Sequence, residues 1–150
     1  MSARVNPVLY RDAALVDTSA VFALFDETDQ LHDEARRFFQ TNKLGLAWYA
    51  IDTTAHESYT RVRYDLSRSK AVNAYSLLRG FCIQVVRHVP DDEEHAWLLL
   101  ERYAEHALSF QDALCAAVMR RIGVFKVFTF DHDFWTMGFE VIPGLTARRR

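Results

Sequence analysis

The chain has 150 residues, of which 50% are hydrophobic and 25% are charged. This length fits one domain and buries enough surface to fold without disulfide or metal staples. Five glycines and three prolines are too few for a collagen-like or low-complexity chain, and no apolar run is long enough to cross a membrane. Because the first residues lack the apolar stretch of a signal peptide, we expect one cytoplasmic domain over 1–150, with flexible ends at 1–12 and 145–150.

The net charge of −2 does not by itself indicate a class of partner. The two cysteines, Cys82 and Cys115, lie among apolar residues and lack the Cys-x-x-Cys spacing. Two such residues cannot build a disulfide scaffold, so we expect unreactive buried thiols in a reducing compartment. Composition therefore favours a globular domain over the secreted disulfide-rich and membrane-spanning classes.

The first half of the chain alternates between strand and helix patterns. After a short apolar run, Asp17, Thr18 and Ser19 offer three consecutive capping residues, and apolar residues follow at helical spacing. The expected elements are a strand at 13–16, helices at 18–27 and 30–42, a strand at 44–50, and helices at 53–64 and 67–79.

The second half continues the alternation. Pro90 is followed by four acids, which start a helix because acids in the first turn complement the helix macrodipole. Ser109 opens the next helix and Gly123 ends it. The expected elements are a strand at 81–89, helices at 91–107 and 109–122, a strand at 124–130, a turn or short helix at 131–136, and a strand at 139–142.

This order of elements predicts an α/β fold. Strands that alternate with helices form a central, mainly parallel sheet with helices on both faces, which gives three layers, α/β/α. The crossover connections of such a sheet are right-handed. Binding and catalytic sites of such sheets lie at the carboxyl edge of the strands, so the position of a residue along the chain predicts its place in space.

Four separated segments direct carboxylates at this edge. Asp17 and Asp131 each follow a predicted strand directly, and Asp133 lies two residues beyond Asp131. Asp112 lies in the first turn of the helix that leads into the 124–130 strand, and Glu57 lies about two turns along the helix that follows the 44–50 strand. We therefore expect these side chains to meet at one place.

Carboxylates that share a site repel one another and raise one another's pKa values, and a bound divalent cation removes that cost. Ligands that are all oxygen suit Mg²⁺ or Mn²⁺ rather than zinc. Such a cation activates water and stabilises the charge that develops during phosphodiester hydrolysis. The pattern therefore indicates a metal-dependent hydrolase of phosphodiesters.

Taken alone, each acid also has an ordinary structural explanation. Asp17 could cap the first helix, and Asp112 could complete a Ser-x-x-Asp cap. Glu57 could form an ion pair on the helix surface with the basic residue four positions later. Asp131 and Asp133 could be turn or loop residues. Only the joint placement favours the metal site, and that placement depends on the inferred topology.

The sequence resembles PIN-domain ribonucleases, in particular the VapC-type toxins of bacterial toxin–antitoxin pairs. Four stretches carry the resemblance: LVDTSAVFALF, IDTTAHESYTRV, LSFQDALCAAVMRRIG and VFTFDHDFWTMGFEVIPG. Together they cover most of residues 13–144. Their order and spacing are more specific than any one of them.

The resemblance implies a Mg²⁺ or Mn²⁺ site that hydrolyses RNA. By position, its four acids correspond to Asp17, Glu57, Asp112 and Asp131, with Asp133 as a further candidate ligand. The hydroxyl residues Thr18, Ser19 and Thr129 match supporting positions and are expected to orient carboxylates or water. The resemblance also implies a cognate antitoxin, bound in a groove on the helices at 18–27 and 30–42, and often a homodimer.

Basic and aromatic residues near Glu57 are candidates for RNA contact. Basic side chains that could hold phosphates are Arg61, Arg63, Arg68 and Lys70, and aromatic ones that could stack on bases are Trp48, Tyr49, Tyr59 and Tyr64. A solvated helix face and core packing are the alternatives for the two sets.

A toxin ribonuclease is one of several functions that an α/β domain rich in carboxylates could have. A PIN-like module for RNA processing or RNA binding, without a toxin role, fits the same residues. A haloacid dehalogenase-like phosphatase requires Asp-x-Asp after the first strand, whereas Thr18 and Ser19 follow Asp17 here. A phosphoacceptor receiver requires paired acids near the N-terminus and a late lysine, but Lys126 lies inside a predicted strand.

Overall fold

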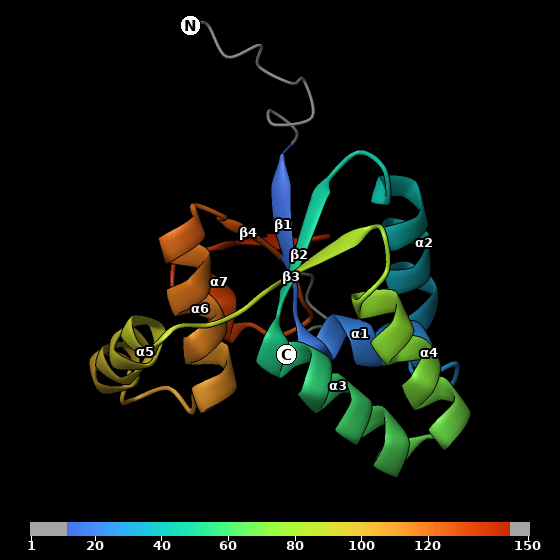
Figure 1. Ribbon diagram of the computed structural model, residues 1–150, viewed down its shortest axis with the longest axis horizontal. Coiled ribbons are helices and arrows are strands. Elements are labelled where there is room, and N and C mark those ends of the chain that lie inside the picture. Colours follow the sequence, from blue (N-terminus) through green and yellow to red (C-terminus); the bar gives the residue numbers. More distant parts are fainter. Residues whose placement is uncertain (1–11, 145–150) are drawn as a thin grey trace, which may run out of the picture.

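The computed structural model of the protein describes residues 12–144. The flexible ends expected at 1–12 and 145–150 fall, apart from Asp12, outside the described residues. The strands form one five-stranded sheet in the order β3-β2-β1-β4-β5, and every neighbouring pair is parallel (Figure 1). The predicted α/β class with a parallel central sheet is confirmed.

In chain order, the elements are β1 (Ala13–Val16), α1 (Thr18–Phe25), α2 (His32–Asn42), β2 (Ala47–Ile51), α3 (Asp52–Asp65), α4 (Arg68–Leu78), β3 (Ile83–Val86), α5 (Pro90–Arg102), α6 (Phe110–Ile122), β4 (Lys126–Phe128), α7 (Asp133–Thr136) and β5 (Glu140–Ile142). All of the predicted elements are present in the predicted order. No helix in the described part of the chain is long and apolar enough to span a membrane.

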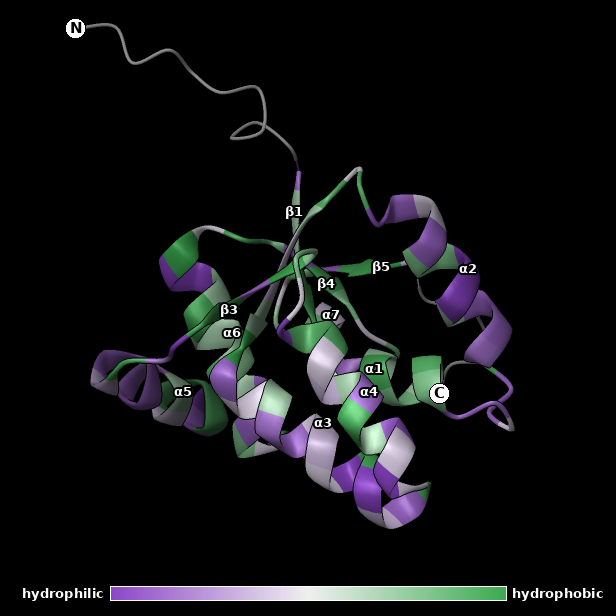
Figure 2. Ribbon diagram, turned by 45° about the vertical axis from the view of Figure 1, so that its right-hand side comes forward, coloured by the Kyte–Doolittle hydropathy of each residue, from purple (hydrophilic) through white to green (hydrophobic). Residues whose placement is uncertain are grey.

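The helices form a layer on each face of the sheet. Helices α1 to α4 pack on one face and α5 to α7 on the other, each layer around its own apolar cluster (Figure 1). Strand β1 serves both clusters, because Ala14 and Val16 face one layer and Leu15 faces the other. A strand covered on both faces has no polar side, which is why β1 is apolar throughout. Figure 2 shows hydrophobic colouring along the strands and hydrophilic stretches on the outer helices.

Three strands are shorter than predicted by two residues or more, because the backbone groups at their ends form other hydrogen bonds. The start of the 44–50 prediction is a turn, in which the Leu46 amide donates to the Asn42 carbonyl at 3.2 Å. At the end of the 81–89 prediction, the His88 amide donates to Asp52 Oδ1 at 3.3 Å instead of to a strand. The end of the 124–130 prediction leaves β4, and the amides of Phe130 and Asp131 donate to side-chain hydroxyls.

Gly123 ends helix α6 in the left-handed conformation, with φ 73°. A Cβ at this position would meet no atom within 4 Å. A side chain here would therefore destabilise the fold only through the strain of the left-handed backbone conformation. Gly123→Ala should lower the free energy of unfolding by about 1 kcal/mol, measured by urea denaturation. The matched control is Gly45→Ala, which also has open space but no positive φ and should change stability by less than about 0.5 kcal/mol. Equal effects at both positions would contradict this explanation.

Candidate metal centre

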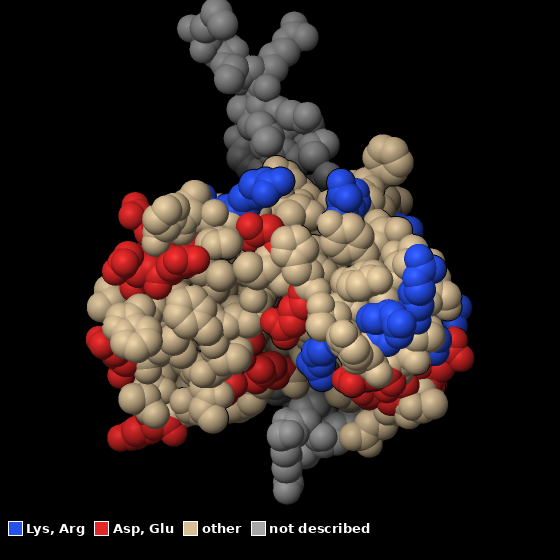
Figure 3. All heavy atoms as spheres, turned by 60° about the horizontal axis from the view of Figure 1, so that its bottom comes forward, with Lys and Arg blue, Asp and Glu red and all other residues tan. Residues whose placement is uncertain are grey.

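The carboxyl ends of β1 and β4 meet at the point where the strand order reverses. The chain builds β1, β2 and β3 outwards in one direction and then returns to add β4 on the other side of β1. Ligands of open parallel sheets bind in the crevice at such a switch point. Asp17 follows β1 and Asp131 lies three residues beyond β4. Figure 3 looks towards this edge and shows acidic side chains in the seam at its centre.

Asp17 is held in place by three donors and is only 3% exposed. Its Oδ2 accepts hydrogen bonds from Ser19 Oγ at 2.8 Å, from Thr129 Oγ1 at 2.9 Å and from the Ser19 amide at 3.2 Å. The last of these bonds is the helix cap of α1. The helix-cap explanation of Asp17 is therefore correct and coexists with its place among the other acids.

The two hydroxyls also fix the backbone beyond β4. Ser19 Oγ accepts from the Phe130 amide at 3.0 Å, and Thr129 Oγ1 accepts from the Asp131 amide at 2.9 Å. Asp131 Oδ1 in turn accepts from the Asp133 amide at 2.9 Å. A chain of hydrogen bonds thus joins the end of β1 to the turn that carries the later acids.

Asp112, Asp131 and Asp133 each offer one carboxylate oxygen within 4.8 Å of the others. Asp112 lies in the first turn of α6, where its amide donates to the capping Ser109 Oγ at 3.0 Å. It is 8% exposed, whereas Asp131 and Asp133 are partly exposed. The residue that the sequence placed at the margin of the site, Asp133, lies inside this group.

The electrostatics show how strongly the acids interact. Burial, followed by the charges of Asp17 and Asp131, raises the pKa of Asp112 from 3.8 to about 8. Burial also raises the pKa of Asp17, and hydrogen bonds from Ser19 and Thr129 offset part of that rise. The carboxylates therefore lie close enough together to raise one another's pKa values.

The two outer acids are affected in the same direction. Burial, and then the charge of Asp17, raises the pKa of Glu57, while Arg61 opposes the rise. Burial and the charge of Asp131 raise the pKa of Asp133. Glu57 therefore interacts electrostatically with Asp17, and Asp133 interacts with Asp131.

The donor set fits a hard divalent cation. Every ionisable group of the cluster is a carboxylate, and oxygen ligands are those that Mg²⁺ and Mn²⁺ prefer. A bound cation would relieve the same repulsion that raises the pKa values of these carboxyls. Thr18 is buried, but its Oγ1 has no hydrogen-bond partner among residues 12–144, so it does not join the hydroxyl network of Ser19 and Thr129.

The predicted basic residues do not form a single patch at the acids. The Arg61 guanidinium lies 4.8 Å from the centre of the Phe22 ring and lowers the pKa of Glu57. Lys70 instead acts on Asp26, whose pKa is lowered mainly by a hydrogen bond from Thr28. Arg63 and Arg68 are exposed, and neither forms an ion pair with an acid among residues 12–144. Trp48, which is 2% exposed, belongs to the core, as its alternative interpretation predicted.

A buried polar group beneath the acids was missed by the sequence analysis. Thr54 Oγ1 accepts from Gln111 Nε2 at 2.9 Å and lies 3.6 Å from Cys115 Sγ, which links α3 to α6. Burial raises the pKa of the Cys115 thiol well above its ordinary value, and nearby acids add to this. The available signal was Thr54 and Ser58, two polar residues four positions apart on the buried side of α3.

The chain is similar in sequence and in overall fold to known proteins. A family model described as PIN domain matches residues 14–140. The 23S rRNA-specific endonuclease VapC20 of Mycobacterium tuberculosis is 33% identical over 132 residues, which are 85% of this chain and 97% of the relative. The crystal structure of VapC20, described as a Sarcin-Ricin loop cleaving toxin, has a TM-score of 0.79 at 30% identity and covers 85% of this chain and 96% of that one. A toxin–antitoxin complex from Klebsiella pneumoniae shares the fold, with a TM-score of 0.61 at 18% identity over 90% of this chain and 97% of that one.

The chain therefore belongs to the PIN-domain family, as the sequence motifs indicated. Most of its parallel sheet, the aspartate after β1 and the acids beyond β4 lie within the matched region.

The raised pKa of Asp112 predicts a pH-dependent stability. The folded protein keeps a proton between pH 3.8 and about 8 that the unfolded chain has lost, so the stability of the metal-free protein should fall as pH rises through this window. Thermal melting from pH 5 to pH 9 measures this. The stabilisation by added Mg²⁺ should grow over the same range, because the cation competes with the proton.

Asp112→Asn is the control for this dependence, because it removes the titrating carboxyl from α6. It should flatten the fall in melting temperature and weaken the stabilisation by Mg²⁺. A pH profile in Asp112→Asn that matches the wild type would contradict the assignment of the titration to Asp112.

Proposed function

We propose that this protein is a metal-dependent endoribonuclease that hydrolyses phosphodiester bonds in RNA and acts as the toxin of a toxin–antitoxin pair. The observation that carries the proposal is the meeting of Asp17, Asp112 and Asp131 at the switch point, against their own repulsion. The identity of 33% to a 23S rRNA-specific endonuclease supports RNA as the substrate.

The acids would hold Mg²⁺ or Mn²⁺. Asp17 and Asp112 would be the main ligands, Glu57 and Asp131 would complete the site, and Asp133 would contribute from the Asp131 side. When bound, the cation supplies Lewis-acid chemistry: it lowers the pKa of a water and screens the negative charge of the phosphodiester.

The residues of this chain prepare that chemistry. Ser19 and Thr129 donate to one oxygen of Asp17 and so fix its carboxylate orientation, which leaves Oδ1 without a recorded protein donor in the described part of the chain. Asp112 must release its proton before it can act as an anionic ligand, because its pKa of about 8 keeps it largely protonated at neutral pH. Cys115 is fully buried with a raised pKa, so it does not act as a nucleophile.

Contact with RNA phosphates would come from basic residues near the acids. Arg61 is the best placed, because its guanidinium is held over Phe22 and acts on Glu57. Arg63, Arg68 and Lys70 would extend this contact along the surface. Phosphate contacts of this kind add affinity without selecting a base sequence.

A groove on α1, α2 and α4 supports an antitoxin partner. This cavity of about 390 Å³ has apolar side chains, including Leu24, Phe25 and Phe39, with Arg36 and Lys43 beside them. It lies on the helices from which the sequence resemblance predicted antitoxin binding. The description of VapC20 as a toxin also supports the toxin role. We propose in addition that the protein forms a homodimer in the cytoplasm.

Loss of either central acid should abolish cleavage while the protein stays folded. Asp17→Asn and Asp112→Asn should each lower the cleavage rate at least about a hundredfold in Mg²⁺, because charge stabilisation is typically the largest catalytic term. The assay is gel analysis of a labelled RNA hairpin that carries the sarcin–ricin loop sequence, the substrate for which VapC20 is described.

The matched control is Asp65→Asn, which removes an exposed aspartate at the end of α3 and should cleave at the wild-type rate. Circular dichroism of each variant verifies the fold. Undiminished cleavage by either Asp17→Asn or Asp112→Asn would refute the metal site.

Expression in a bacterial host separates the toxin from an RNA-processing module. The wild type should arrest growth and Asp17→Asn should not, because arrest requires RNA cleavage. A small antitoxin expressed with the wild type should co-purify with it and restore growth. Normal growth with a protein that is active as a nuclease in vitro would favour the module without a toxin role.

A further inference from the structure

Two adjoining cavities lie on the side of α3 that carries α4 and β3. One has a volume of about 360 Å³ and is lined by residues that include Asp52, Tyr75, Arg79 and Arg87. The other, of about 350 Å³, is lined by His56, Tyr59, Thr60 and Tyr75. They share His56 and Tyr75, and we refer to the two together as the α3–α4 trough.

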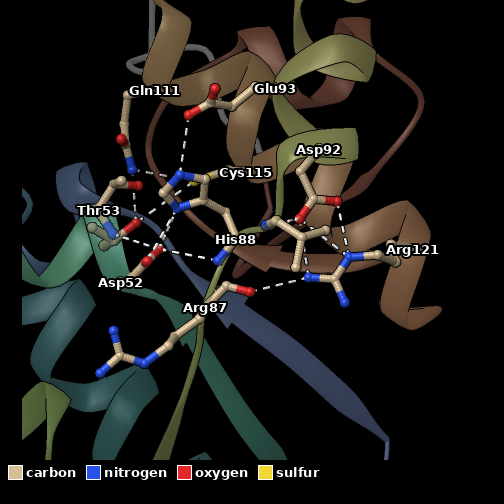
Figure 4. Close-up of polar contacts among 11 residues, drawn as sticks. Asp52, Thr53, Arg87, His88, Asp92, Glu93, Gln111, Cys115 and Arg121 are labelled. Carbon is tan, nitrogen blue, oxygen red and sulfur yellow. Dashed lines mark hydrogen bonds and ion pairs between the residues drawn. The ribbon is translucent and has the colours of Figure 1, made fainter.

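The trough is lined by two arginines that form no ion pair in the described part of the chain. Arg79 and Arg87 are both exposed, and neither forms an ion pair with a carboxylate among residues 12–144. The one acid that lines the trough, Asp52, is occupied by His88, whose Nδ1 lies 3.0 Å from both of its oxygens. Figure 4 shows this pair and the Arg87 guanidinium, which points away from it.

The Arg87 backbone is held in a fixed position. Its carbonyl accepts from Arg121 Nη2 at 3.2 Å, and the Arg121 guanidinium also binds Asp92, at 2.9 Å from Nε to Oδ1 (Figure 4). Asp92 is 2% exposed, so this contact anchors the segment between β3 and α5. The side chain of Arg87 therefore projects from a rigid base.

The trough also offers flat surfaces on which a base can stack. The Arg79 guanidinium lies 5.4 Å from the centre of the Tyr75 ring, and the Tyr75 and Tyr59 rings meet edge-on at 6.2 Å. Unpaired bases stack on aromatic rings and on arginine planes, and their phosphates bind cations. An acidic peptide would use the cations but not the rings, so the combination favours single-stranded RNA.

The trough begins beside the metal centre. His56 lines both cavities, and its neighbour Glu57 acts electrostatically with Asp17. We propose that the α3–α4 trough binds the single-stranded RNA that flanks the cleaved bond, with Arg79 and Arg87 on phosphates and Tyr75 against a base. This inference rests on the proposed ribonuclease function and adds to it a path for the substrate.

The test measures binding separately from cleavage. Fluorescence anisotropy of a short labelled single-stranded RNA, in EDTA so that no cleavage occurs, gives Kd as a function of salt. The double variant Arg79→Gln/Arg87→Gln should raise Kd at least about tenfold. It should also reduce the slope of log Kd against log salt by about 1.4, since each phosphate contact to a single strand contributes about 0.7.

Two further variants make the result specific. Tyr75→Ala should raise Kd about fivefold or more through lost stacking while it leaves the salt slope unchanged, because the ring carries no charge. Arg102→Gln is the matched control: its guanidinium lies over Tyr103 at 5.7 Å in the same kind of pair, but outside the trough. It should bind RNA as the wild type does.

Unchanged Kd and slope in the double variant would overturn the proposal. So would unchanged RNA binding together with weakened binding of a hexaglutamate peptide, which would assign the trough to an acidic protein segment. Parallel cleavage assays in Mg²⁺ keep the two proposals apart. If the wild type cleaves RNA and the trough variants bind RNA as tightly as the wild type, only the trough proposal is rejected. If the trough variants bind RNA more weakly but the wild type does not cleave it, only the ribonuclease proposal is rejected.

Discussion

The repulsion among carboxylates held in a small volume is the constraint on which the rest of the site depends. Burial and neighbouring acids raise the pKa of Asp112 to about 8, so the fold maintains an arrangement that is unfavourable when every acid is charged. The arrangement persists because hydroxyl groups from two segments fix Asp17: Ser19 in the first turn of α1, and Thr129 directly after β4. Hydrogen bonds that favour the ionised carboxylate offset part of the cost of burial.

Sheet topology supplies the rest of the geometry. Since β4 lies directly beside β1, the residues that follow these two strands emerge next to each other although more than a hundred residues separate them. The hydroxyl of Thr129 therefore reaches Asp17. Helix α6 begins at this edge and presents Asp112 in its first turn. The same layer contacts that bury the apolar strands thus also place the acids.

Charge is divided between two neighbouring regions on either side of Glu57. The candidate metal centre is acidic and would bind a cation, whereas the trough lined by Arg79 and Arg87 is cationic and would bind an anion. Asp52, which would otherwise neutralise the trough, is bound to His88. The proposed RNA substrate would match both charge patterns, with its phosphates at the arginines and the cleaved bond at the acids.

The sequence by itself determined the order and type of every element and the carboxylates at the edge, because apolar periodicity, caps such as Asp17 and stops such as Gly123 act locally. Tertiary structure decided where the strands end, since the amides of His88, Phe130 and Asp131 find side-chain acceptors instead of strand partners. It also decided that Asp133 joins the close acidic group and that Arg79 and Arg87, eight residues apart, line one cavity. Such relations depend on how separate elements pack, and no local pattern in the chain encodes that packing.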